Sequence, residues 1–130
     1  MTNLPEPLKF VLHGSEWRWT HLADAVAEAF ESVWHPAAFA KVGDHDHCDI
    51  CFFRLASDDD PAISTGFRSG SRWLCNECHT HFIRSGDRCF ICGGTLGDTG
   101  DKVEGCTLHP QRKYRWYHHA CYDHACGVGV

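Results

Sequence analysis

A seven-residue pattern that occurs twice places the strongest constraint on the fold of this chain. Residues 72–78 read R-W-L-C-N-E-C and residues 115–121 read R-W-Y-H-H-A-C, so the second copy chiefly replaces one cysteine with a histidine. Cysteine and histidine are the two side chains that zinc most readily accepts in one ligand position. The pattern therefore predicts that both copies supply ligands to a metal ion.

A Cys-x-x-Cys pair precedes each copy at a similar distance, which makes an internal repeat of about 40 residues. Such a length suits one supersecondary unit closed by one metal. Alignment of the copies places His118 over Cys75 and His119 over Asn76, so His118 is the predicted ligand and His119 is not. We expect two Zn²⁺ per chain, one bound by Cys48, Cys51, Cys75 and Cys78, the other by Cys89, Cys92, His118 and Cys121.

The surroundings of the nine cysteines favour metal binding over disulfides. The N-terminus has neither the basic start nor the apolar segment of an export signal, and no stretch is apolar for about 18 residues. The sequence thus predicts a cytoplasmic protein without a membrane segment. In a reducing compartment, Cys-x-x-Cys pairs bind metals more often than they form disulfides.

The charge of the chain bears on its partners. Twelve Lys and Arg stand against 17 Asp and Glu, giving a formal net charge of -5. Thiolates bound to zinc would make the net charge more negative, about -8. Affinity for nucleic acid comes mainly from neutralising phosphates with Lys and Arg. The balance therefore argues against nucleic acid and favours a protein partner with a basic contact surface.

The region before the first cysteine pair predicts a strand and a helix. Residues 4–12 end in a β-prone run, and apolar residues at helical spacing predict a helix from His21 to about Trp34. Thr20 is the expected N-cap, and Pro36 is expected to end the helix. The tryptophans of this region, Trp17, Trp19 and Trp34, are interpreted as part of a small core shared with the first metal unit, the alternative being a binding surface.

The first unit is expected to run from a cysteine turn through a β-hairpin to a short helix. The runs at residues 52–55 and 66–73 would form the hairpin around an acidic turn at residues 58–60, and residues 76–86 would form the helix. The second unit repeats this order, with a turn at residues 89–94, a hairpin and loop up to about Arg115, and a last helix.

There is a geometric reason to expect metal ligands at the start of a helix. Residues three apart share a helix face, so Cys75 and Cys78 can reach one ion, and free N–H groups there favour thiolates. The fold class that follows is a small, zinc-stabilised α+β protein. Its expected regions are an N-terminal strand and helix (1–43), a first zinc module (44–86) and a second zinc module (87–130), with close packing of all three into one unit left open.

Turn, hairpin and helix in this order resemble a treble clef, and residues 89–92 with residues 116–121 resemble the zinc-binding halves of LIM and PHD domains. The resemblance covers roughly residues 45–126 and is local. It implies zinc-stabilised modules. The chain departs from LIM domains in the longer separation of its two modules and from PHD domains in ligand-pair spacing, so we expect sequential sites, with crossed pairing of the ligand pairs as the alternative.

Several residues of ligand type stand outside these two sets. His45 and His47 precede the first pair and are interpreted as surface or neighbouring histidines, because four cysteines already complete a tetrahedral shell. A second metal there is the alternative. Cys106 fits a free thiol or, with a nearby histidine, an alternative ligand. Nothing in the sequence gives Cys126 a role.

The function expected from these observations is that of a non-catalytic zinc protein that binds another protein, as an adaptor or an immunity or antitoxin-like protein. Catalytic zinc keeps an open position, whereas both predicted sites reach four protein ligands. Nucleases of the HNH type also use a treble clef, but the interval between Cys51 and Cys75 contains no histidine. An HNH-like nuclease and a nucleic-acid-binding zinc protein are the alternatives.

Overall fold

The computed structural model describes residues 6–97 and 101–127. Within these ranges the chain is a small mixed α+β protein with four α-helices, one π-helical turn and several sheets of two or three strands. The beginning of the predicted strand 4–12, residues 98–100 of the predicted loop and the end of the predicted third region lie outside the described residues. No described helix is both long and apolar enough to cross a membrane.

A hairpin and a helix begin the described chain. Strands β1 (Lys9–Leu12) and β2 (Ser15–Arg18) pair with Leu12 opposite Ser15, which leaves His13 and Gly14 as the two loop residues. Both have positive φ, 50° and 78°, as a twisted two-residue hairpin turn requires. The predicted strand is therefore present, with a partner that the sequence pattern did not indicate.

Helix α1 (Trp19–Ala29) differs from the predicted helix at both ends. It begins at Trp19, whose side chain is buried, and Thr20 is not its N-cap. It ends early because the chain turns so that the Trp34 indole N–H donates to the carbonyl of Ala29 at 2.7 Å, satisfying one of the free carbonyls at the helix end. Pro36 lies beyond this turn, in strand β3 (His35–Ala38).

The first metal unit contains two hairpins instead of the predicted one. Strand β4 (His45–His47) pairs with β5 (Arg54–Ala56) around the first cysteine pair, and β6 (Thr65–Ser69) pairs with β7 (Arg72–Leu74). The predicted pairing of residues 52–55 with residues 66–73 was therefore wrong. Both runs are equally β-prone, so local propensity could not choose the partner.

One further strand pairing and short helical segments complete this unit. The edge strand β3 adds to β6, giving the order β3-β6-β7. Between β5 and β6, Asp60 accepts a hydrogen bond from the backbone of Ala62 and caps the short helix α2 (Pro61–Ser64), with proline at its first position. The expected acidic turn at residues 58–60 is thus exposed and leads into a helical turn. After β7, helix α3 (Asn76–Cys78) continues into the π-helical turn η1 (His79–Ile83).

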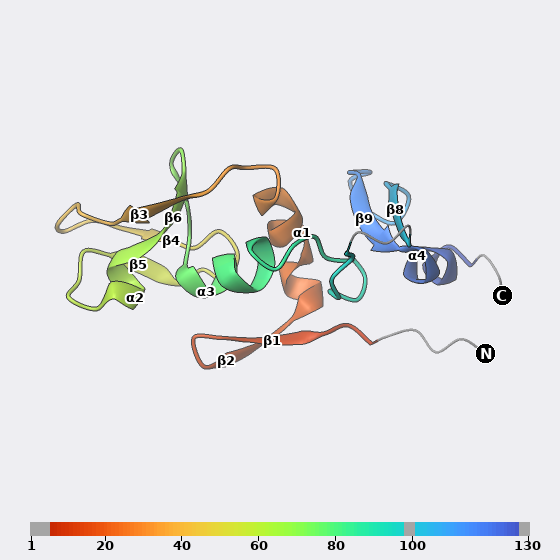
Figure 1. Ribbon diagram of the computed structural model, residues 1–130, viewed down its shortest axis with the longest axis horizontal. Coiled ribbons are helices and arrows are strands. Elements are labelled where there is room, and N and C mark those ends of the chain that lie inside the picture. The colour runs from red at the N-terminus through yellow and green to blue at the C-terminus, as the bar shows by residue number, and fades with distance from the viewer. Residues whose placement is uncertain (1–5, 98–100, 128–130) are drawn as a thin grey trace.

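The second unit has the predicted order of turn, hairpin and helix, but its hairpin continues past Arg115, where it was expected to end. Strand β8 (Lys102–Gly105) pairs with β9 (Arg115–His118), and helix α4 (His119–Ala125) begins directly after it. Figure 1 shows α1 between the sheets of the first unit and the β8–β9 hairpin of the second.

The hydrophobic core joins the N-terminal region to the first unit. Trp19 and Trp34 are buried in one cluster with Leu55, Leu74 and the first four cysteines, and Trp17 packs against it. The core interpretation of these tryptophans is confirmed. A smaller cluster around Tyr117 fills the second unit, and Phe90 packs against both clusters. Since β3 pairs with β6 across position 43, the three-region division remains a prediction.

Candidate metal centres

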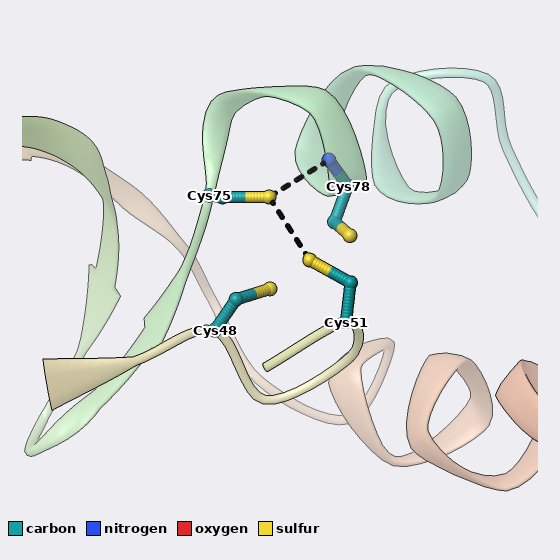
Figure 2. Close-up of side chains that lie close together, drawn as sticks. All are labelled: Cys48, Cys51, Cys75 and Cys78. Atoms are coloured by element: carbon teal, nitrogen blue, oxygen red, sulfur yellow. Dashed lines mark hydrogen bonds between the residues drawn. The ribbon is translucent and has the colours of Figure 1, made fainter. Parts of the chain in front are cut away.

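The first four predicted ligands gather in one buried cluster. Their sulfur atoms lie within 4.8 Å of one another, and the most exposed of the four, Cys51, is 7% exposed. Cys48 and Cys51 come from the turn between β4 and β5, whereas Cys75 is the N-cap of α3 and Cys78 lies in that helix (Figure 2).

The spacing of these sulfurs fits a tetrahedral metal. The Sγ atoms of Cys51 and Cys75 are 3.6 Å apart. In a tetrahedral thiolate site with Zn–S bonds of about 2.3 Å, neighbouring sulfurs are separated by about 3.8 Å. All nine cysteines are free. The cluster is therefore compatible with one bound metal ion.

The four thiols of this cluster lie close enough to shift one another's pKa values. Hydrogen bonding with the thiols of Cys51 and Cys75 lowers the pKa of the Cys48 thiol. Hydrogen bonding with Cys48 in turn raises the pKa values of Cys75 and Cys78. Like-charged groups this close cannot all ionise by themselves. A metal ion would remove that penalty and hold all four as thiolates.

Backbone amides of the turn and helix are aimed at the sulfurs. The N–H of Ile50 lies 3.4 Å from Cys48 Sγ, and the N–H of Cys78 lies 3.4 Å from Cys75 Sγ. Such N–H···S contacts orient thiolate ligands and offset part of their negative charge. The local chain therefore presents the sulfurs in a form suited to a metal.

The second cluster combines three cysteines with a histidine. Its ligand atoms also lie within 4.8 Å of one another. His118 Nδ1 is 3.3 Å from Cys92 Sγ and 3.9 Å from Cys121 Sγ, which brackets the separation of about 3.5 Å expected between sulfur and nitrogen ligands of one tetrahedral zinc. Burial raises the pKa of the Cys121 thiol to about 12, so this site too needs a cation to hold thiolates.

The other ring nitrogen of His118 fixes its orientation. His118 Nε2 lies 3.0 Å from the carbonyl oxygen of Thr95, which can only accept, so the proton belongs on Nε2 and the Nδ1 lone pair faces the sulfurs. The adjacent His119 points elsewhere, with its Nδ1 3.0 Å from Asp123 Oδ2. The structure thus places His118, and not His119, in the cluster.

The two clusters share a backbone arrangement. The residue after each first cysteine donates its N–H to the tryptophan carbonyl of the repeated pattern, Asp49 to Trp73 at 2.9 Å and Phe90 to Trp116 at 2.8 Å. The ligand pairs group in sequence order, as expected, and not in the crossed arrangement. That these eight residues bind metal stays a prediction.

His13 is a residue at the first cluster that the sequence did not indicate. Its Nε2 lies 3.2 Å from Cys75 Sγ, and its Nδ1 lies 2.6 Å from Glu77 Oε2. The ring stacks on Phe53, with centroids 3.6 Å apart. This contact joins the tip of the β1–β2 hairpin to a candidate ligand. Because His13 and Cys75 are 62 residues apart, no spacing pattern in the sequence indicates the contact.

The remaining residues of ligand type stay outside both clusters. His45 and His47 lie on β4 with their rings 5.1 Å apart, and His47 stacks on Phe52. Cys106 is half-buried, and the nearby His109 instead contacts Asp24 Oδ1 at 2.7 Å. Neither pair belongs to a group of three or more ligand-type side chains in the ranges the structure describes.

Comparison with protein-family models, with curated proteins and with solved structures finds no match to the chain. The site geometry shows two Cys/His clusters compatible with two metal ions, and it is on these clusters that a functional proposal has to rest.

Proposed function

We propose that both clusters bind Zn²⁺ as structural sites and that the chain is a non-catalytic module for binding another protein. Four thiolates, or three thiolates and one imidazole, in a tetrahedral arrangement are the donor sets typical of structural zinc. The observation that carries the proposal is that each cluster already offers four protein ligand atoms within 4.8 Å. A tetrahedral ion there has no position left for water or substrate.

The element order supports modules of the treble-clef type, similar in their zinc-binding halves to LIM and PHD domains. In both units a cysteine turn is followed by a hairpin, and the last two ligands sit at the start of a helix. A bound metal stabilises a small unit that could not be held by its hydrophobic core alone. Such a unit gives the surface around it a rigid support.

The charge of the chain supports a basic partner. The net charge is -5 before thiolates are counted, and the bend before α2 presents exposed acidic side chains. An acidic surface steers a basic partner by long-range attraction and is weakened by salt. An adaptor or an immunity or antitoxin-like protein of the cytoplasm that covers a basic surface has these properties.

Elemental analysis of protein purified without added metal tests the first part, with an expected two zinc ions per chain. The protein-binding function is tested by affinity purification with the tagged chain. It is expected to retain a specific protein that is released as the salt concentration rises. A reproducible content near one zinc would contradict the two-site proposal. Metal-dependent cleavage of DNA or RNA, lost in His45→Ala or His47→Ala variants that remain folded, would replace the binding function with a nuclease function.

A further inference from the structure

A cleft opens between helix α1 and strand β9, and none of its lining residues is a candidate metal ligand. Its volume is about 370 Å³. Val26, Phe30 and Phe90 line its apolar part, and Val26 is only 1% exposed. Clefts of this size and lining are the usual sites for small ligands or for an anchoring side chain of a partner.

Two aromatic side chains border this cleft and remain accessible, one in β9 and one just before it. Tyr114 is 66% exposed and Trp116 is 38% exposed. Large aromatic side chains beside an apolar cleft are enriched at the anchor points of protein interfaces. They indicate an occupant with an apolar portion.

The acidic side chains that line the cleft are left largely without partners. Glu31 and Glu104 line it, and neither forms an ion pair within the described ranges. Asp87 approaches Lys102 only at 3.9 Å. Two carboxylates that form no ion pair, at an apolar cleft, favour an occupant that carries positive charge.

The two arginines that line the cleft do not cancel this charge. The guanidinium of Arg115 is held by Asp24 and Glu28, at 3.2 and 2.8 Å. The guanidinium of Arg88 lies 5.0 Å from the ring centre of Phe10, which does not line the cleft, and it donates to the carbonyl of Gly93. Both cations are therefore engaged by other parts of the chain.

We propose that this cleft receives a lysine or arginine side chain of the partner protein, an inference that rests on the protein-binding function proposed above. The alkyl stem of that side chain packs on Val26 and Phe30, and its charged head lies near Glu31 and Glu104. Lysine and arginine are the side chains that combine an apolar stem with a cationic head. The ammonium of Lys102 already lies over the Trp116 ring, 4.9 Å from its centre, so the carboxylates of Glu31 and Glu104, and not this ring, attract the cationic head.

The test uses zinc-loaded, full-length protein and a defined probe, the peptide acetyl-Gly-Lys-Gly-Lys-Gly-Lys-amide. Its matched control carries acetyl-lysine at each lysine, which keeps the stem and removes the charge. Titration followed by ¹H–¹⁵N spectra should shift the indole N–H of Trp116 and the amides of Phe30 and Glu104 with the lysine peptide only. Equal shifts with both peptides, or shifts confined to other regions, would overturn the proposal.

Matched variants separate the cleft from general attraction. The double variant Glu31→Gln/Glu104→Gln should bind the lysine peptide at least about tenfold more weakly, because both charges of the site are lost. The control Glu16→Gln/Asp59→Asn removes two exposed charges elsewhere, on β2 and in the bend before α2, and should change affinity less than about twofold. Equal losses in the two variants would mean general attraction and refute the site.

A variant that fills the cleft gives a second readout. Ala27 lies in α1 and lines the cleft, so Ala27→Leu keeps a good helix former while occupying the space, and should abolish the peptide shifts with an otherwise unchanged spectrum. A salt-sensitive partner that is retained by Glu31→Gln/Glu104→Gln would refute the cleft assignment and leave the binding function intact. Specific peptide binding without any protein partner would uphold the cleft and refute the broader function.

Discussion

The two copies of the repeated pattern have the same backbone role and opposite side-chain environments. In each, the tryptophan carbonyl accepts a hydrogen bond from the cysteine turn. Trp73 is nevertheless 6% exposed and Trp116 is 38% exposed. The preceding arginines are reversed, with side-chain exposures of 42% for Arg72 and 4% for Arg115.

The neighbours of each copy explain the reversal. The first copy lies in a three-stranded sheet, where Phe39 packs on Trp73 with ring centres 5.4 Å apart. The second copy lies in a two-stranded sheet beside α1, whose Asp24 and Glu28 compensate the buried charge of Arg115. The repeated pattern thus sets the backbone and the candidate ligands. The elements of the chain that pack against each copy decide which of its side chains are buried.

The largest expected effect is that of removing a ligand from the first cluster, and it tests how much of the chain depends on that cluster for folding. Cys75→Ala should unfold the first unit together with β1, β2 and α1, because all of them share one core and structural zinc contributes on the order of 10 kcal/mol. Amide spectra and zinc content measure this loss. The control Cys106→Ala removes a thiol outside both clusters and should leave the fold and both zinc ions in place.

Loss of the second cluster should have a more confined effect. His118→Ala should disorder β8, β9 and α4 and lower the zinc content to about one per chain, while the larger core around α1 persists. His119→Ala, at the exposed neighbouring position, should be tolerated. Amide spectra of both variants make the comparison, and disruption by His119→Ala alone would show that the alignment of the two copies is wrong.

The packing of the second cysteine turn on α1 can be tested at a glycine. A Cβ at Gly93 would stand 2.7 Å from the Trp19 ring, and φ is +78°, so Gly93→Ala should destabilise the fold by about 2–4 kcal/mol. Gly97 has φ +66° but open space, so Gly97→Ala should cost only about 1 kcal/mol. Thermal unfolding of the zinc-loaded variants measures both, and equal costs would mean that Trp19 contact contributes nothing.

The smallest expected effect concerns the ion pairs that link α1 to Arg115, at the start of β9, and to Lys113, just before it. The hydrogen bond from Lys113, with that from Arg115, lowers the pKa of Glu28. A carboxyl group with a lowered pKa in the folded state stabilises it above its unfolded pKa of about 4.3, and that stability is lost as pH falls through the lower folded value.

Glu28→Gln should therefore cost about 0.5 kcal/mol near neutral pH, a figure reduced for solvent screening because a third of the side chain is exposed. The cost should decline as pH falls below the unfolded pKa of about 4.3 and disappear below the lowered folded pKa. Urea unfolding of the zinc-loaded protein at several pH values measures it. Glu31→Gln is the matched control, since Glu31 forms no ion pair in the ranges described, and an equal pH-dependent cost there would contradict the assignment.

The sequence by itself determined the grouping of the eight ligand-type residues and the plan of the second unit. Ligands three positions apart, in a turn or at a helix start, are placed by local geometry, so their spacing can be read directly. The alignment of the copies likewise separated His118 from His119. The same local rules predicted the α+β class, since turn, strand and helix signals are short-range.

Only the tertiary structure decided the contacts between segments distant in the chain. It paired β5 with β4 instead of β6, brought His13 to Cys75, and buried Arg115 against α1. Strand propensity does not name a partner, and hydrogen bonds between distant residues leave no periodic trace in sequence. The cleft beside α1 arises for the same reason, because its walls come from segments that meet only when the chain has folded.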